Sequence, residues 1–168
     1  MKRTILIVIL ALLTALTIAY IFSNSFADSE QSNEQSDSVV EIVRPIIDPD
    51  ASLPDEELDV IVRKTAHIVE FAVLGVMTAL LCLSIFRFSW KDALKNICIP
   101  LFIILTVGVC DEYIQSLNDR TSMVEDVLID FGGGLIGLAL TSSVYAIVRL
   151  IQTAKSKKRA LKIPIIKN

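Results

Sequence analysis

The chain has 168 residues, 53% of them hydrophobic, a mean hydropathy of +0.61 and a net charge of −3. A soluble domain of this length carries more charge and shorter apolar runs. The composition therefore excludes an ordinary soluble domain.

Four apolar stretches are long enough to cross a bilayer, which takes about 20 helical residues at about 1.5 Å each. They are Thr4–Phe22, Ala66–Phe86, Ile97–Ile114 and Val127–Leu150. We therefore predict an all-α fold, an integral membrane bundle of about four transmembrane helices. No length remains for a separate soluble domain of ordinary size.

The first stretch, within residues 1–22, is predicted to be an N-terminal transmembrane anchor. Lys2-Arg3, the apolar run and Ser25-Phe26-Ala27 together also resemble a secretory signal with a cleavage site. The run of about 19 residues is longer than the usual signal core of about 7–15 residues. The length favours a retained helix, and cleavage would leave the other three spans in the same orientation.

The next segment, residues 23–51, is rich in Ser, Asp, Glu, Gln and Asn. Such a composition buries too little apolar surface to offset the entropy of ordering, so we expect an acidic, disordered extracytoplasmic linker. Helix-start signals follow at Ser52-Leu53-Pro54-Asp55-Glu56. Residues 52–150 would then form a three-helix membrane core.

Charge is strongly segregated along the chain. Eleven carboxylates lie between Asp28 and Asp59 against one base, whereas the tail 151–168 contains six bases and no acid. Because basic loops stay in the cytoplasm, both termini are predicted to be cytoplasmic, with residues 151–168 forming a basic cytoplasmic tail. The acidic segment and the turn at 115–126 are predicted to lie outside.

Ionisable residues within membrane spans are candidates for a functional site, because burying them is costly. Three sets each share one face of a predicted helix at 100° per residue. They are Arg63, His67 and Glu70 in the second span, Asp111, Gln115 and Asn118 in the third, and Asp126 and Asp130 in the fourth. The spans alternate in direction, so all three sets are predicted to meet at the extracytoplasmic face.

Glycines continue the face of the fourth span that carries Asp126 and Asp130. Gly133 and Gly137 form a small-xxx-small pattern, which lets another helix approach closely. We expect these glycines to pack helices and to bring Asp130 toward its partner helices.

Three ordered motifs carry a family resemblance. They are Arg63-Lys64-x-x-His67-x-x-Glu70-Phe71-x-x-Leu74-Gly75, then Asp111-Glu112-x-x-Gln115 with Arg120, and Asp126-Val127-Leu128-Ile129-Asp130-x-x-Gly133-x-x-x-Gly137. Over about residues 63–140 the chain resembles the VanZ-like family of small bacterial multi-pass membrane proteins. It departs at Phe71, where a Tyr is usual, and at Asn118-Asp119, which replaces a Pro-Gly-type turn and affects the placement of Arg120. The family is named after a protein linked to teicoplanin resistance, so the resemblance implies an envelope role in the bacterial cytoplasmic membrane, without supplying a reaction.

Ten residues are the candidates for catalysis or binding. They are Arg63, Lys64, His67, Glu70, Asp111, Glu112, Gln115, Arg120, Asp126 and Asp130. A histidine among carboxylates suits proton transfer, and carboxylates can ligate a divalent cation. The arginines suit bidentate recognition of a phosphate. Alternatively, the acids simply pair with the bases and close a charge network between helices.

Three function classes remain open. The first is a binding protein that engages an anionic lipid or a lipid-linked cell-wall precursor and modulates cell-surface properties, including glycopeptide tolerance. The second is a membrane-embedded hydrolase or transferase acting on a lipid or polyprenyl-phosphate headgroup, with Glu70 or Asp111 as base. The third is a structural scaffold. The sequence has no Gly-rich phosphate loop, zinc-type spacing or serine-nucleophile motif, so no organic cofactor and no nucleic-acid partner are expected.

Overall fold

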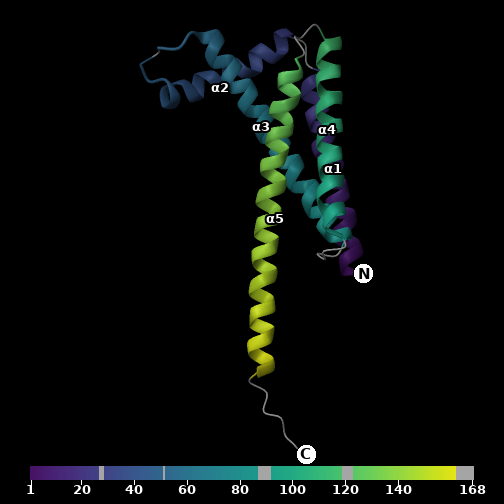
Figure 1. Cartoon of the computed structure of the whole chain (residues 1–168). Coiled ribbons are helices and arrows are strands. Elements are labelled where there is room, and N and C mark those ends of the chain that lie inside the picture. Colours follow the sequence, from purple (N-terminus) through teal and green to yellow (C-terminus); the bar gives the residue numbers. More distant parts are fainter. Residues whose placement is uncertain (27–28, 51, 87–91, 119–122, 162–168) are drawn as a thin grey trace, which may run out of the picture.

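The computed structural model describes residues 1–26, 29–50, 52–86, 92–118 and 123–161, and every regular element among them is a helix. The five helices are α1 (Lys2–Ser25), α2 (Ser29–Ile47), α3 (Asp55–Ile85), α4 (Ala93–Leu117) and α5 (Val124–Leu161) (Figure 1). Four of them, α1, α3, α4 and α5, are long and apolar enough to cross a membrane. This confirms the predicted all-α bundle and its four spans.

Helix α3 lies at the centre of the bundle. It packs against each of the other four described helices, most extensively against α5. The apolar core joins Ile21 of α1, Phe71 and Leu74 of α3, and Ile104 and Val107 of α4. Because this core lies directly beside the polar residues of α3, the packing fixes how the site is presented.

Glycines allow α5 to lie against the backbone of α3. A Cβ at Gly133 would lie 2.5 Å from the carbonyl oxygen of Ile68, and one at Gly137 would overlap the carbonyl of Ala72. From the other side, a Cβ at Gly75 would meet the backbone of α5. Only small residues allow helices to come this close. The contact holds the start of α5 next to α3.

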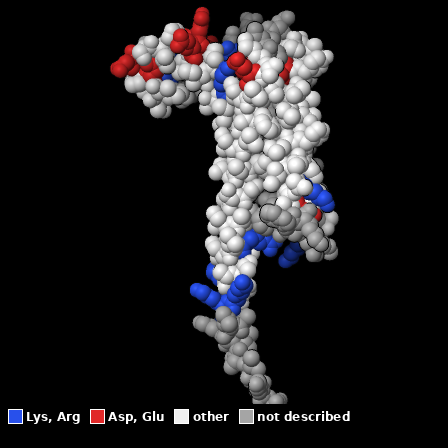
Figure 2. All heavy atoms as spheres, viewed as in Figure 1, with Lys and Arg blue, Asp and Glu red and all other residues white. Residues whose placement is uncertain are grey.

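Acidic and basic side chains occupy opposite ends of the molecule. Figure 2 shows Asp and Glu concentrated at the end that carries α2, and Lys and Arg mostly at the other end. The start of α1 and the end of α5 both lie at the basic end (Figure 1). There Arg3 Nε and Nη2 donate to the carbonyls of Ser84 and Ile85, at 3.1 and 3.0 Å. This arrangement fits an even number of spans, and the side of the membrane that each end faces stays a prediction.

The acidic segment 23–51 differs from the disordered linker expected from its composition. Helix α2 covers Ser29–Ile47 and projects sideways from the bundle (Figure 1). Val39, Val43 and Ile47 recur every four residues and, with α1 and α3, line one groove. These three well-spaced apolar residues give α2 a face to pack with.

Candidate functional site

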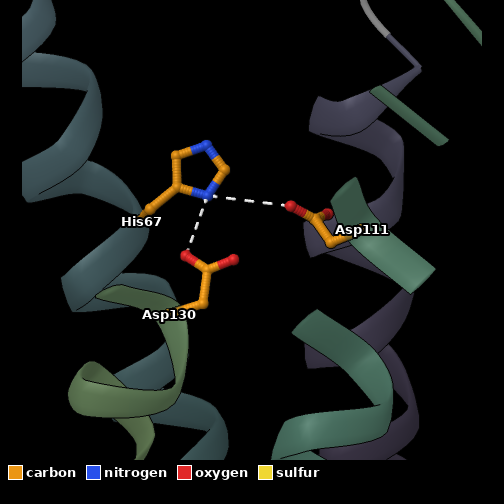
Figure 3. Close-up of side chains that lie close together, drawn as sticks. All are labelled: His67, Asp111 and Asp130. Atoms are coloured by element: carbon orange, nitrogen blue, oxygen red, sulfur yellow. Dashed lines mark ion pairs between the residues drawn. The ribbon is translucent and has the colours of Figure 1, made fainter. Parts of the chain in front are cut away.

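His67 lies between two carboxylates from different helices. Its Nδ1 is 3.4 Å from Oδ1 of Asp130 on α5 and 3.7 Å from Oδ2 of Asp111 on α4 (Figure 3). The side chains of Asp111 and Asp130 are 0% and 1% exposed, whereas that of His67 is 23% exposed. Three residues separated by up to 63 positions in the sequence thus form one cluster, and its two carboxylates are buried.

Asp111 is held by further donors. The Ser25 hydroxyl donates to Oδ1, and the side-chain amide of Gln115 donates to Oδ2 at 2.7 Å. The amide of Asn118 reaches the carbonyl of Ser25 at 3.5 Å. The end of α1 is therefore joined to the end of α4 at this carboxylate.

Glu70 follows His67 by about one helical turn. The side-chain amide of Asn24, on α1, donates to its Oε1 at 2.8 Å. The next residue, Phe71, is fully buried in the apolar core. Glu70 is therefore held at the boundary between polar cluster and core by a contact from α1.

Two ion pairs that include Arg63, Lys64 and Asp126 flank the cluster. Lys64 Nζ lies 3.2 Å from Oδ1 of Asp126, which ties α3 to α5. Arg63 Nη2 lies 2.6 Å from Oδ2 of Asp59, one turn earlier on its own helix. These two ion pairs fit the alternative of a charge network better than a direct part in the cluster.

Glu112 stands apart from the cluster. Glu112 is 5% exposed, and its Oε2 accepts the backbone N–H of Met123 at 3.2 Å, before α5 begins. Arg120 lies outside the described residues. Gly133 and Gly137 lie at the α3–α5 contact, within two turns of Asp130.

A groove of about 940 Å³ opens beside the cluster, between α1, α2 and α3. Its polar lining includes Asn24, Arg63, His67 and Glu70. Leu13, three turns before Asn24 on α1, and Val73, one turn after Glu70 on α3, add apolar lining. The groove therefore offers a polar zone and an apolar zone to one ligand.

Asn24 and Ser25 contact the candidate site but are absent from the residues predicted from the sequence. Both lie at the end of α1, and each donates to a carboxylate of the site. Topology was the available signal. If the N-terminus is cytoplasmic, as predicted, the first span ends at the same membrane depth as the three predicted sets. Neither residue is ionisable, so a search for costly charges passed over them.

The donor groups of the cluster allow two kinds of chemistry. An imidazole between two carboxylates can accept and pass on a proton. The same groups can also ligate a metal ion, because one ligand atom each from His67, Asp111 and Asp130 all lie within 4.8 Å of one another. Both uses would take place at one wall of the groove.

Comparison with protein-family models gives a match to VanZ/LLP1 over residues 6–148. The match begins in α1 and ends in α5, so it includes every described residue of the candidate site and extends well beyond residues 63–140. Comparisons with curated proteins and with solved structures give no match.

Proposed function

The chain belongs to the VanZ/LLP1 family, and we propose that it binds an anionic lipid or a lipid-linked cell-wall precursor. The binding site faces the extracytoplasmic side of a bacterial cytoplasmic membrane, as the segregation of charge supports. Occupancy of this site modulates cell-surface properties, including tolerance of glycopeptides such as teicoplanin.

The groove between α1, α2 and α3 is the observation that carries the proposal. Ligand sites are mostly apolar, with a few polar groups that fix orientation. Here Leu13, Leu16 and Val73 provide apolar wall, and Arg63 and His67 provide polar contacts. This pattern matches an amphiphile whose hydrocarbon chain lies along α1 and α3 and whose headgroup reaches Arg63.

Arg63 can serve the headgroup while it remains paired with Asp59. A guanidinium has five N–H donors and suits bidentate contact with phosphate oxygens. Its side chain is 34% exposed and lines the groove. A phosphate is therefore the headgroup chemistry that this wall supports best.

Native mass spectrometry of the purified protein tests the proposal, with phosphatidylglycerol and undecaprenyl phosphate as the added lipids. Val73→Trp fills the groove and Arg63→Gln removes its cation, so both variants should retain less anionic lipid. Val144→Trp, on an exposed position of α5, and Lys157→Gln, near the other end of the bundle, are matched controls that should behave like the unmodified chain. Equal lipid retention in all five proteins would overturn the proposal.

An enzyme acting on the same headgroup is the second candidate, and the His67 cluster favours it. An imidazole at the groove wall, backed by two buried carboxylates, is an arrangement that suits general acid–base catalysis. Lipid mass profiles of cells with and without the protein separate the two candidates. A new or depleted headgroup species would favour the hydrolase or transferase, and an unchanged profile would favour binding alone.

The structural scaffold is tested in cells through glycopeptide susceptibility and membrane abundance. His67→Asn and Glu70→Gln remove groups of the site with little change in size. Loss of the phenotype at unchanged abundance would rule out a purely structural role. If susceptibility follows abundance in every variant, the scaffold explains the protein better than a binding site does.

A further inference from the structure

We infer that His67, Asp111 and Asp130 hold a divalent transition-metal ion. Each of the three ligands comes from a different helix: α3, α4 and α5 (Figure 3). Ligand atoms on a tetrahedral ion with bonds of about 2.0–2.2 Å lie about 3.3–3.6 Å apart. The distances from His67 Nδ1, 3.4 Å to Asp130 and 3.7 Å to Asp111, match this spacing with little movement.

An unpartnered oxygen of Asp130 is an independent sign of a missing ligand. The side chain is only 1% exposed, and its buried Oδ2 has no hydrogen-bond partner among the described residues. Buried polar atoms without a partner are rare, and a charged one is costly. Figure 3 shows this oxygen pointing toward the side of Asp111, so an ion held by Oδ1 of Asp130 and Oδ2 of Asp111 would lie beside it and compensate its charge.

The surroundings of Asp111 resemble the outer shell of a metal site. Carboxylates that ligate a metal are usually oriented by hydrogen bonds of their own. The hydroxyl of Ser25 and the amide of Gln115 orient Asp111 in this way. They leave its Oδ2 facing His67, where the ion would lie.

Charge gives a second reason for a cation. Two buried carboxylates and a neutral imidazole together carry two negative charges, which a divalent ion balances. The mixed nitrogen and oxygen set suits Zn²⁺ or Mn²⁺, whereas Mg²⁺ and Ca²⁺ prefer oxygen ligands alone. Three protein ligands also leave one coordination position open for an exogenous group.

The open position connects the ion to the groove, and this step rests on the proposed function. His67 belongs both to the cluster and to the groove lining. Glu70 lines the same wall and would repel an anionic headgroup. A bound cation would reverse that repulsion, so it would act with Arg63 in attracting a phosphate.

Zinc titration of the purified full chain, against a chromophoric chelator, tests the metal site without lipid. We expect one equivalent of Zn²⁺ to bind and to raise the midpoint of thermal unfolding. Asp130→Asn should weaken binding by at least about 10-fold, by comparison with losses of even outer-shell groups. Glu125→Gln, which removes an exposed carboxylate from the same helix, is the matched control and should bind like the unmodified chain.

The results separate the metal site from the lipid site. Absence of stoichiometric Zn²⁺ binding to the unmodified chain, or equal competition by Mg²⁺, would overturn the metal inference even if the variants fail to fold. Retention of phosphatidylglycerol in that case would leave the proposed function standing. Binding of Zn²⁺ without lipid retention would support the metal site and contradict the lipid site. We expect the unmodified chain to bind Zn²⁺ and to retain lipid. Lipid retention should fall when a chelator removes the metal.

Discussion

Asp111 shows how strongly the polar residues of the site depend on one another. Its carboxylate is fully buried and contacts Ser25 of α1, Gln115 of its own helix and His67 of α3. A buried charge is tolerated only when hydrogen bonds or opposite charge compensate for lost hydration. Loss of a single neighbour should therefore affect stability as well as ligand binding.

Ser25→Ala tests this dependence. The substitution removes the hydroxyl that donates to Asp111, so we expect the free energy of unfolding to fall by about 1–3 kcal/mol. Ser23→Ala is the matched control, because the exposed Ser23 hydroxyl donates to the carbonyl of Tyr20 in its own helix. Thermal unfolding in detergent measures both. Equal midpoints for the two variants would mean that the Asp111 contact contributes little.

The sequence predicted the positions of the charged residues in the cluster better than it predicted their hydrogen-bond and ion-pair partners. Periodicity placed His67, Asp111 and Asp130 on faces that meet, because a costly charge repeated at helical spacing is a strong signal. Asn24 and Ser25 gave no such signal, since small polar residues are common at helix ends. The partner of Arg63 could not be predicted either, because Asp59 on the same helix competes with acids on other helices.

Helices α3 and α5 approach so closely that the backbone of one contacts the other. Gly133 and Gly137 make this approach possible, and the cluster depends on it because Asp130 lies one turn before Gly133. Gly132 is adjacent in sequence, but a Cβ there would meet nothing within 4 Å among the described residues. The two neighbouring glycines therefore have different roles.

Gly133→Ala and Gly132→Ala form a matched pair that tests the α3–α5 contact. The added methyl at Gly133 would overlap the carbonyl of Ile68, so we expect a loss of about 1–3 kcal/mol in stability. At Gly132 the methyl is free and alanine favours helix, so we expect no loss and a gain of up to about 1 kcal/mol. Unfolding in detergent measures both. Similar effects at the two positions would contradict the close packing.

Helix α2 lies in the segment whose composition predicts a disordered linker. The segment is polar enough to be predicted as disordered, but it is helical over Ser29–Ile47 and lines the groove through Val39 and Val43. Four-residue spacing of these valines was visible in the sequence, though the surface that they pack with was not. That surface exists only after α1 and α3 come together.

The connection between α2 and α3 should respond to pH through Asp48. The backbone N–H of Leu53 and both donors of Ser52 hydrogen-bond its carboxylate, and with nearby Arg44 they hold the pKa of Asp48 below its ordinary value of about 3.9. Because the pKa is lower in the folded chain, this contribution to stability is complete above the unfolded pKa and is lost as pH falls through the folded pKa.

Amide NMR of Ser52 and Leu53 against pH measures this effect. We expect both signals to titrate with a midpoint below about 3.9, and Asp48→Asn to abolish the titration. A midpoint at or above that value would show that the hydrogen bonds from Leu53 and Ser52 do not hold Asp48 in its charged form.

The molecule as a whole combines segregated charge with a polar cluster, two features that the sequence shows separately. Charge segregation predicted which ends of the helices meet. The acidic side chains gather at the end that carries α2 (Figure 2), and the groove is lined both by α2 and by His67 of the cluster. The first span, predicted to be an anchor outside a three-helix core, contacts the candidate site through Asn24 and Ser25. The match to the family begins at residue 6 and therefore includes α1.

Retention of α1 is accordingly expected in the mature protein. Cleavage after Ala27 would remove Ser25 from Asp111, Asn24 from Glu70 and the fully buried Ile21 from the core. Buried carboxylates would lose their donors and one wall of the groove would be absent, which makes the cleaved chain less stable as a fold. Intact-mass measurement of the protein, purified through a C-terminal tag, should give the full chain of 18.5 kDa plus the tag. A mass that begins at residue 28 would show that α1 is only a signal, and the site would then have to work without it.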